Sequence, residues 1–319
     1  MNKNTLFTIA IPAFKSKFLG EAIESCLLQT YSNFEVVIVD DASPEDLKSV
    51  VDGYHDDRIR FYRNEKNCGA VDVVDNWNIC LSYAKGDYII CMGDDDRLLP
   101  CCLEEYLKLM EKYPGLGVYH AWTEIIDEDS NVFDLQQPRP EWESVLSLIW
   151  NRWNGREKQF IGDFCFSRNC LLSLDGFYKL PMAWGSDDIS AVRSATQGGI
   201  ANTQTLCFQY RVNRHTRSKT GSQVVKVEAI IKERIWYSDY LSSFDKLHNL
   251  TPTDEIFLKL TKKTLYHFFY IRFKLALSRD MKNKWWRISY WMKRHKELHC
   301  SKFDILYFLL IAIKEKIKQ

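Results

Sequence analysis

The most informative segment of the sequence reads Asp87-Tyr88-Ile89-Ile90-Cys91-Met92-Gly93-Asp94-Asp95-Asp96. Its first six residues form a mainly apolar run of the length typical of a buried β-strand. Three carboxylates follow, and like charges gathered at a strand end repel one another and lose hydration. A hard divalent cation relieves that repulsion, because it prefers oxygen ligands and leaves room for phosphate oxygens. The segment therefore predicts either a metal–diphosphate site or a solvated acidic turn that ends at Pro100.

The residues around this segment alternate between strand and helix patterns. Short apolar or β-branched runs predict strands at Phe7–Pro12, Phe34–Val39, Ile59–Tyr62, Asp87–Met92 and Gly117–Trp122. Helical spacing predicts helices at Leu19–Gln29, from Pro44 onward with Ser43 as its cap, at Val71–Ala84 and at Leu103–Lys112. Strands separated by helices indicate a parallel α/β sheet, in which ligands bind beyond the carboxyl ends of the strands. From Pro138 to Thr220 the pattern is irregular, and beyond it is helical.

Composition agrees with a globular protein but shows an uneven charge. The 319 residues are 46% hydrophobic and 27% charged, with a net charge of +1. Residues 251–319 hold 16 Lys and Arg against 6 Asp and Glu, so they carry +10 and the first 250 residues carry −9. The ten cysteines show no zinc-type spacing, which predicts free thiols in a reducing cytoplasm. No signal-peptide pattern precedes the first strand, and the longest apolar run, Ile305–Ile313, is too short for a membrane span.

Four segments, in this order, resemble family 2 glycosyltransferases, the inverting nucleotide-sugar enzymes of the GT-A fold. Ile9–Phe14 is similar to the opening strand and turn of that family, and Ser25–Ser43 to its pattern S-x-x-x-Q-T-Y-x-N-x-E-x-x-x-x-D-D-x-S. Asn78–Ile89 is similar to N-x-G-x-x-x-A-K-G-x-Y-I, and Asp94–Pro100 to the metal motif D-D-x-x-x-P. The resemblance implies a Rossmann-like GT-A domain over residues 1–220, with a mixed, mostly parallel sheet flanked by helices. Residues 221–319 would form a helical C-terminal appendage.

The resemblance implies roles for residues at the nucleotide end of the site. Asp41 resembles the carboxylate that hydrogen-bonds the nucleotide base, and such an acceptor suits the imide N–H of uracil. Its alternative role is to cap the next helix, a role that Asp40 could take instead. Pro12 and Phe14 resemble residues that line the same pocket, and Asp94 resembles a ribose contact.

The same resemblance implies residues that hold the metal and the diphosphate. Asp95 resembles the ligand of Mn²⁺ or Mg²⁺, and Asp96 is a second candidate because Asp94 and Asp96 form a D-x-D spacing. Arg211 lies in a segment similar to the Y-R-x-H of the family, which lies over the diphosphate, with Asn213 where His is common. Arg211 is expected to clamp diphosphate oxygens, and Arg214 and Arg217 are either further clamps or solvated charges.

A second acidic pair predicts the general base. The family often has Glu-Asp in this region, with Arg six residues after the Asp, and counting back from Arg193 gives Asp187. Asp187 is therefore the expected base, with Asp188 as the second candidate. The alternative is that one of the two caps a helix over 189–196 that Gly198 and Gly199 end.

The segment after Lys282 interleaves Trp, Tyr and Phe with Lys and Arg. This composition favours an interfacial helix on an anionic membrane, with a packed helical appendage as the alternative. Aromatic and basic residues are also common at nucleic-acid surfaces, but no nucleic-acid partner is predicted.

Taken with the resemblance, the sequence predicts an inverting glycosyltransferase in cell-surface polysaccharide synthesis. Its donor would be a nucleotide-diphospho-sugar, with a UDP-sugar favoured, and its acceptor a hydroxyl of a glycan or lipid-linked oligosaccharide. The expected location is the cytoplasm, peripheral on the inner face of the plasma membrane. One alternative is sugar transfer to a polyprenyl phosphate, which is already ionised and needs no base. Another is a catalytically silent module that binds nucleotide sugars.

Overall fold

The computed structural model describes residues 4–212, 222–247 and 250–317. The chain divides into two compact units: Met1–Lys179 with Ser186–Thr216, and Leu180–Gly185 with Arg217–Gln319. The predicted boundary between residues 220 and 221, together with Asn213, Arg214 and Arg217, lies outside the described residues.

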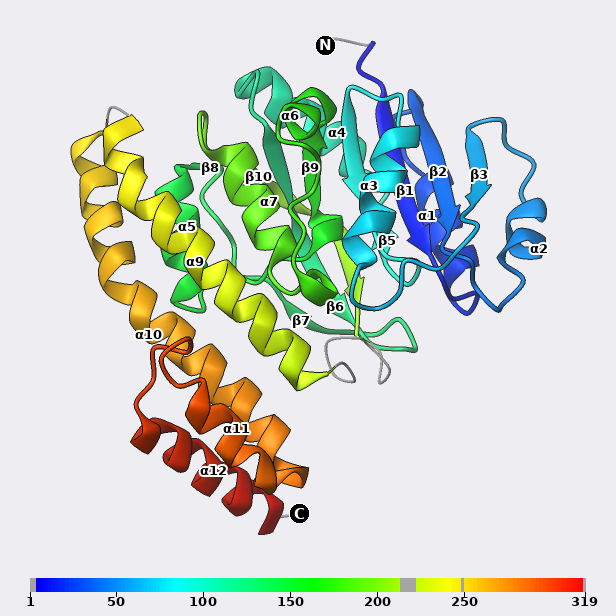
Figure 1. Ribbon diagram of the computed structural model, residues 1–319. Helices are drawn as coiled ribbons and strands as arrows, with labels where there is room; N and C mark the ends of the chain where they lie inside the picture. The colour runs from blue at the N-terminus through cyan, green and yellow to red at the C-terminus, as the bar shows by residue number, and fades with distance from the viewer. Residues whose placement is uncertain (1–3, 213–221, 248–249, 318–319) are drawn as a thin grey trace. The chain divides into compact units, whose positions relative to one another are not determined.

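The first unit is built around one mixed sheet (Figure 1), in the strand order β3-β2-β1-β4-β9-β6-β10-β5. The strands on this path are β1 (Phe7–Ala13), β2 (Phe34–Asp40), β3 (Ile59–Arg63), β4 (Tyr88–Cys91), β5 (Arg97–Leu98), β6 (Val118–Ile126), β9 (Phe164–Ser167) and β10 (Ile200–Arg211). Off this path, β7 (Val132–Leu135) pairs with β6, and β8 (Trp142–Glu143) pairs with β10.

Parallel pairing aligns the ends of the first strands, as the sequence predicts. β1 pairs in parallel with β2 and β4, so that Ala13 lies beside Asp40, and Ala10 beside Cys91. Every residue of β2 is buried, which agrees with its unbroken β-branched pattern. The loops that carry Phe14, Asp41 and Asp94 therefore all follow the carboxyl ends of these parallel strands.

The helices of the first unit are α1 (Leu19–Leu27), α2 (Leu47–Asp52), α3 (Val73–Tyr83), α4 (Cys102–Lys112), α5 (Val145–Trp153), α6 (Arg168–Ser173) and α7 (Ser186–Ala195), with the 3₁₀ turn η1 (Ile161–Asp163). The predicted cap of α2 is wrong. The helix begins at Leu47 because the Asp46 carboxylate accepts the N–H of Ser49, whereas Ser43 Oγ donates to Phe14 O. The capping alternative for Asp187 and Asp188 is also wrong, since both lie inside the first turn of α7.

The segment that reads as irregular contains β8, β9 and β10 of the sheet. β9 lies antiparallel between β4 and β6, and β10 runs parallel to β6. β9 has only four residues, too few for a clear period. β10 has register shifts between Asn202 and Phe208, and such irregularities break the alternation of buried and exposed residues that marks a strand.

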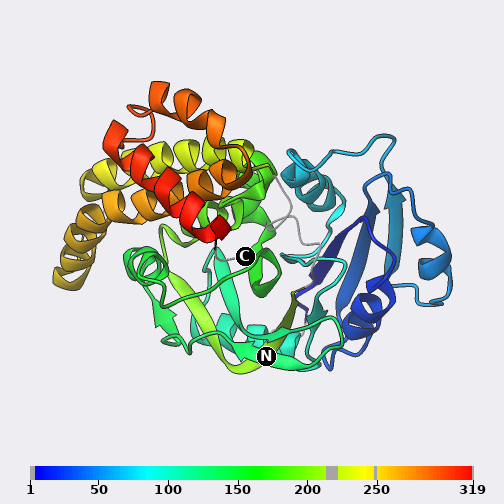
Figure 2. The same ribbon diagram turned by 90° about the horizontal axis from the view of Figure 1, so that it is seen from below.

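The second unit is helical, as expected. It contains the 3₁₀ turn η2 (Pro181–Ala183), α9 (Gln223–Leu247), α10 (Pro252–Asn283), η3 (Trp285–Arg287), α11 (Ile288–Lys293) and α12 (Lys302–Ile317). α10 packs against both α9 and α12 (Figure 2). Inside this unit the buried Trp291 donates its indole N–H to Asp280 at 3.0 Å. Among the described residues, no helix combines the length and the apolar character that crossing a membrane requires.

Candidate active site

Hydrogen bonds join the loops that follow the carboxyl ends of β1, β2 and β4. Asp94 Oδ2 accepts the backbone N–H groups of Phe14 and Lys15, each at 2.7 Å. Ser43 Oγ, which follows β2, donates to Phe14 O at 2.6 Å. Pro12 and Phe14 are half-buried at the end of β1. The structure therefore brings the predicted nucleotide-site residues of these loops to one place.

Asp41 is buried and holds the loop that follows β3. Its Oδ1 accepts from Asn64 Nδ2 at 3.0 Å and from the N–H of Cys68 at 2.9 Å. The turn after β2 uses the neighbouring carboxylate instead, since Asp40 Oδ1 accepts the N–H of Ser43 at 2.7 Å. Asp41 thus holds the loop after β3, whereas local turn formation falls to Asp40. The predicted contact of Asp41 with the nucleotide base stays a prediction.

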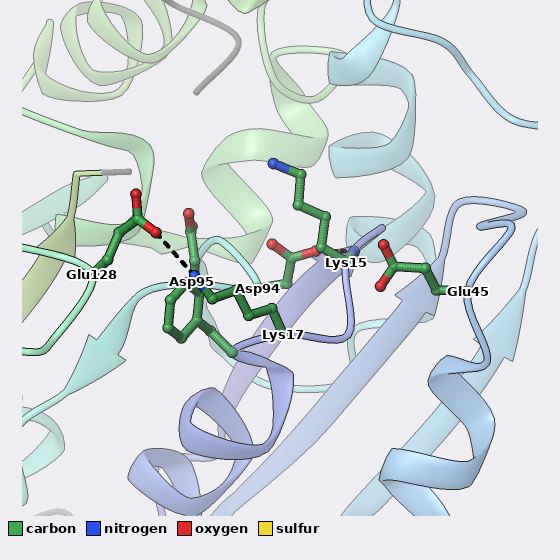
Figure 3. Close-up of a pocket in the computed structure, with 7 residues that line it drawn as sticks. Lys15, Lys17, Glu45, Asp94, Asp95 and Glu128 are labelled. Atoms are coloured by element: carbon green, nitrogen blue, oxygen red, sulfur yellow. Dashed lines mark hydrogen bonds and ion pairs between the residues drawn. The ribbon is translucent and has the colours of Figure 1, made fainter. Parts of the chain in front are cut away.

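Asp94 and Asp95 line a pocket of about 240 Å³ (Figure 3). The lining residues are Lys15, Lys17, Phe18, Glu45, Asp94, Asp95 and Glu128. Lys17 Nζ lies 2.9 Å from Glu128 Oε2, an ion pair between the loop after β1 and the turn between β6 and β7. Ammonium groups suit a diphosphate, and carboxylates suit a divalent cation. The sequence did not single out either lysine as a site residue, although Lys15 stands where the resembled family commonly has Asn.

Asp96 plays a different part from its two neighbours. It is buried, and it accepts the N–H of Arg211 at 3.0 Å and the N–H of Gly93 at 3.2 Å. Burial, and then the charge of Asp95, raise the pKa of Asp96 well above its ordinary value. Asp96 is not among the described residues that line the pocket.

Two carboxylates in the pocket are of the kind that a hard divalent cation prefers as ligands. A Cβ at Gly93 would lie 2.9 Å from Asp96 Oδ2 and 3.0 Å from Asp95 Oδ1, so a side chain at this position would displace these carboxylates. Asp94 and Asp95 supply oxygen ligands of the type that Mg²⁺ and Mn²⁺ prefer. Within the part of the chain that the structure describes, no three His, Cys, Asp or Glu side chains are grouped to hold a metal ion.

Arg211 joins the loops around the pocket. Its side chain is completely buried; Nε donates to Asp95 O at 2.8 Å, and Nη2 donates to Glu21 Oε2 at 2.7 Å. Nη1 reaches the turn between β6 and β7, at Asp127 O and Ser130 Oγ. The structure therefore shows Arg211 binding the protein's own loops, while its predicted contact with diphosphate stays a prediction.

The second acidic pair lies in the first turn of α7. Asp188 is buried, and its Oδ1 accepts from Arg152 Nε at 3.0 Å and from Gln159 Nε2. Asp187 is half-buried. Burial, and then the charge of Asp188, raise the pKa of Asp187 to about 8, whereas Arg152 opposes the rise. A carboxyl group with a pKa near neutrality is suited to accept a proton during a reaction.

Tyr210 on β10 connects the two groups of carboxylates. Its ring stacks on Phe160, with ring centroids 3.6 Å apart and planes 7° apart. Burial raises the pKa of Tyr210, and the charges of Asp96, Asp95 and then Asp187 raise it further. The half-buried phenol of Tyr210 thus lies in the electrostatic field of both Asp95–Asp96 and Asp187. The sequence pattern did not single out Phe160, and Tyr210 entered only through its place in a family motif.

Comparison with known proteins gives one family match. The sequence model of Glycosyl transferase family 2 matches residues 8–179, which is more than half of the chain. A similar curated protein is the putative colanic acid biosynthesis glycosyl transferase WcaA of Escherichia coli, 38% identical over 110 residues. That match covers 34% of this chain and 38% of WcaA. The chain spans only about two fifths of the length of the first curated relatives it matches.

Two solved structures share the fold across nearly the whole chain. Residues 1–349 of S. aureus TarS give a TM-score of 0.63 at 14% identity, covering 98% of this chain and 91% of that one, and TarS has also been solved with UDP-GlcNAc. The mannosyltransferase PcManGT of Pyrobaculum calidifontis, in complex with GDP-Man and Mn²⁺, gives 0.54 at 16% identity, covering 98% and 86%. At these identities the likeness shows the fold alone. It confirms the predicted GT-A-like mixed sheet with flanking and C-terminal helices.

Proposed function

The chain belongs to glycosyl transferase family 2, and we propose that it transfers a sugar from a nucleotide-diphospho-sugar to an acceptor hydroxyl with inversion at the anomeric carbon. Two features of the structure support this proposal. A pocket lined by both acidic and basic side chains lies at the strand ends, and Asp187 on α7 has a raised pKa. TarS with UDP-GlcNAc and PcManGT with GDP-Man show that proteins of this fold bind such donors. A UDP-sugar is our favoured donor because the carboxylate of Asp41 suits the uracil imide.

In this proposal, the base and ribose of the nucleotide sugar lie over Asp41, Pro12, Phe14 and Asp94. The diphosphate lies beside Lys15 and Lys17. Asp95 and Asp94 would hold Mn²⁺ or Mg²⁺, which supplies charge neutralisation for the leaving nucleoside diphosphate. The metal-bound PcManGT supports the choice of cation. Asp96 and Arg211 hold these loops in place through their contacts with the backbone.

The acceptor hydroxyl must lose its proton as it attacks the anomeric carbon. Asp187 takes that proton in its ionised form, so the step speeds up as the pH rises through the pKa of Asp187. Attack from the face opposite to the leaving group inverts the configuration. No covalent intermediate is needed, because the acceptor oxygen bonds to the anomeric carbon in the same displacement that releases the nucleoside diphosphate.

The raised pKa of Asp187 favours a hydroxyl acceptor over a polyprenyl phosphate, which would need no base. Since WcaA is named for colanic acid biosynthesis, we propose a glycan or lipid-linked oligosaccharide of a cell-surface polysaccharide as the acceptor. The silent-module alternative predicts donor binding without turnover. Transfer and hydrolysis assays on the same donors separate these three functions.

A donor screen tests the proposal first. With Mn²⁺ or Mg²⁺ present, one nucleotide-diphospho-sugar should raise the melting temperature, because a ligand that binds only the native state stabilises it by about 2.7 kcal/mol at 100 times its Kd. The shift should disappear in EDTA, and the same donor should be consumed when an acceptor is added. A panel in which no nucleotide or nucleotide sugar shifts melting, with or without metal, would contradict the proposed function.

We also propose that the second unit contacts an anionic membrane on the cytoplasmic side. α12 is apolar on two faces: Ile305, Phe308 and Ala312 are buried, whereas Phe303 and Leu310 are 83% and 64% exposed. Trp285 and Trp286 are also exposed, at 62% and 58%. A helix that is apolar all round normally has both faces covered. The Lys and Arg excess after Thr251 favours anionic lipid as the cover.

A vesicle experiment tests this surface. The full chain should co-sediment with vesicles that contain phosphatidylserine at low salt and dissociate at high salt, since each basic residue near the surface contributes about 1 kcal/mol and is screened. Leu310→Glu, which places a charge on the exposed face of α12, should abolish sedimentation and leave the nucleotide-dependent melting shift unchanged. Lys48→Glu, an exposed site in the first unit, is the control. Failure of the wild-type chain to sediment at low salt refutes the membrane contact.

A further inference from the structure

Behind the acidic pair of α7 lies a chain of buried polar side chains that no step described above uses. Asp188 is fixed by Arg152 and Gln159, and Gln159 Oε1 in turn accepts from Arg139 Nη2 at 3.2 Å. Arg139 Nη1 lies 3.7 Å from Glu157 Oε2. Asp188, Gln159, Arg139 and Glu157 are all more than nine-tenths buried.

Burying charges costs free energy unless they are paired, so such a chain needs a reason. Within the described residues, Glu157 Oε2 and two nitrogens of Arg139 lack a hydrogen-bond partner. Burial raises the pKa of Glu157 to about 8 even though Arg139 opposes the rise. These features describe a polar network that is costly for stability and that ends on the residue next to the proposed base. Costly buried polar groups of this kind gather at functional sites.

We propose that Asp188, held by Arg152 and Gln159, is a positioning residue that fixes the first turn of α7 and sets the protonation state of Asp187. The inference rests on the proposed function, because it assigns Asp187 the role of base. Asp188 has its Oδ1 taken by two donors and lies in the interior, so it is poorly placed to reach an acceptor. Asp187 remains half-buried and accessible.

The charges around Asp187 act on its pKa in opposite directions. Asp188 on α7 and Asp163 on η1 favour the protonated form of Asp187, whereas Arg152 on α5 favours the ionised form. Tyr210 on β10 also lies in the field of Asp187. A charge within about 4–6 Å moves a carboxyl pKa by about 1–3 units. Removing Asp188 or Arg152 should therefore move the protonation of Asp187 in opposite directions.

The experiment measures the titration of Asp187 directly. With ¹³C-labelled Asp carboxyl groups, the Asp187 signal is assigned by its loss in Asp187→Asn, and its midpoint is followed by NMR. In Asp188→Asn the midpoint should fall by about 1 unit or more, and in Arg152→Gln it should rise, because the removed charges have opposite sign. Arg152→Lys, which keeps the charge, should stay near wild type. Arg156→Gln is the matched control, since Arg156 is an exposed arginine that stacks on Trp150.

In a transfer assay, the acid limb of kcat/KM should move in the same directions, while the Kd for nucleotide diphosphate stays unchanged. Midpoints that shift in the same direction for both variants, or that do not shift in folded protein, refute the inference. A merely structural role would lower the melting temperature without moving the midpoints in opposite directions. If the wild-type chain transfers no sugar, the proposed function fails, yet the NMR titration still decides whether Asp188 and Arg152 control Asp187.

Discussion

Asp187→Asn is expected to lower turnover by about 10²-fold or more, the scale of losing a general base. Asn cannot accept the acceptor proton, although it keeps the size of the side chain. Asp187 lies on α7 and is not among the described residues that line the pocket of Asp94 and Asp95, so nucleotide affinity should remain. Single-turnover transfer with saturating donor measures the chemical step, and calorimetry with nucleotide diphosphate measures binding.

Asp188→Asn serves as the matched control for this change. The amide can still accept from Arg152 and Gln159, so the first turn of α7 should stay in place. Its turnover should fall less than that of Asp187→Asn, and its acid limb should move to lower pH. If Asp188→Asn proves the more damaging variant, the two residues exchange roles and Asp188 is the base.

Most of the fold of the first 120 residues was readable from the sequence, because strands such as β1, β2 and β4 are mainly apolar runs between helices with a regular period. β2, with seven buried residues, is the clearest example. The two-residue β5 was not predicted. β9 and β10 were missed for physical reasons: one is four residues long, and the other is interrupted by register shifts. The strand order, which places β9 between β4 and β6, depends on contacts between segments far apart in the chain.

The candidate site shows the same division. Asp94, Asp95 and Asp187 were identifiable because their carboxylates stand in short local motifs. The environment of Arg211 could not be foreseen, since its partner Glu21 is 190 residues away. The buried chain from Asp188 to Glu157 was equally hidden, because Arg139, Arg152 and Gln159 lie in segments without a recognisable pattern. Sequence reasoning therefore found candidate reactive groups, and the fold supplied the groups that hold them.

The strand-end cluster gives the second large effect. Asp95→Asn is expected to weaken metal-dependent binding of UDP or a related nucleotide diphosphate by at least about 10-fold. Even the loss of a residue that only orients a metal ligand lowers metal affinity by about 10-fold or more, and Asp95 is proposed as a direct ligand. An amide oxygen is a weaker ligand than a carboxylate for Mg²⁺ or Mn²⁺. Calorimetric titration with and without EDTA measures the effect, since the wild-type affinity should fall in EDTA toward that of the variant.

Glu128→Gln is the control for Asp95→Asn, because it removes one negative charge from the same pocket without altering the strand-end cluster. A general change in pocket charge would affect both variants alike and would be screened by salt. Loss of a metal ligand affects only Asp95→Asn and persists at high salt, because direct coordination does not depend on long-range fields. Unchanged wild-type affinity in EDTA would show instead that Lys15 and Lys17 bind the diphosphate without a cation, and Asp94 and Asp95 would then serve to hold the loops of the pocket.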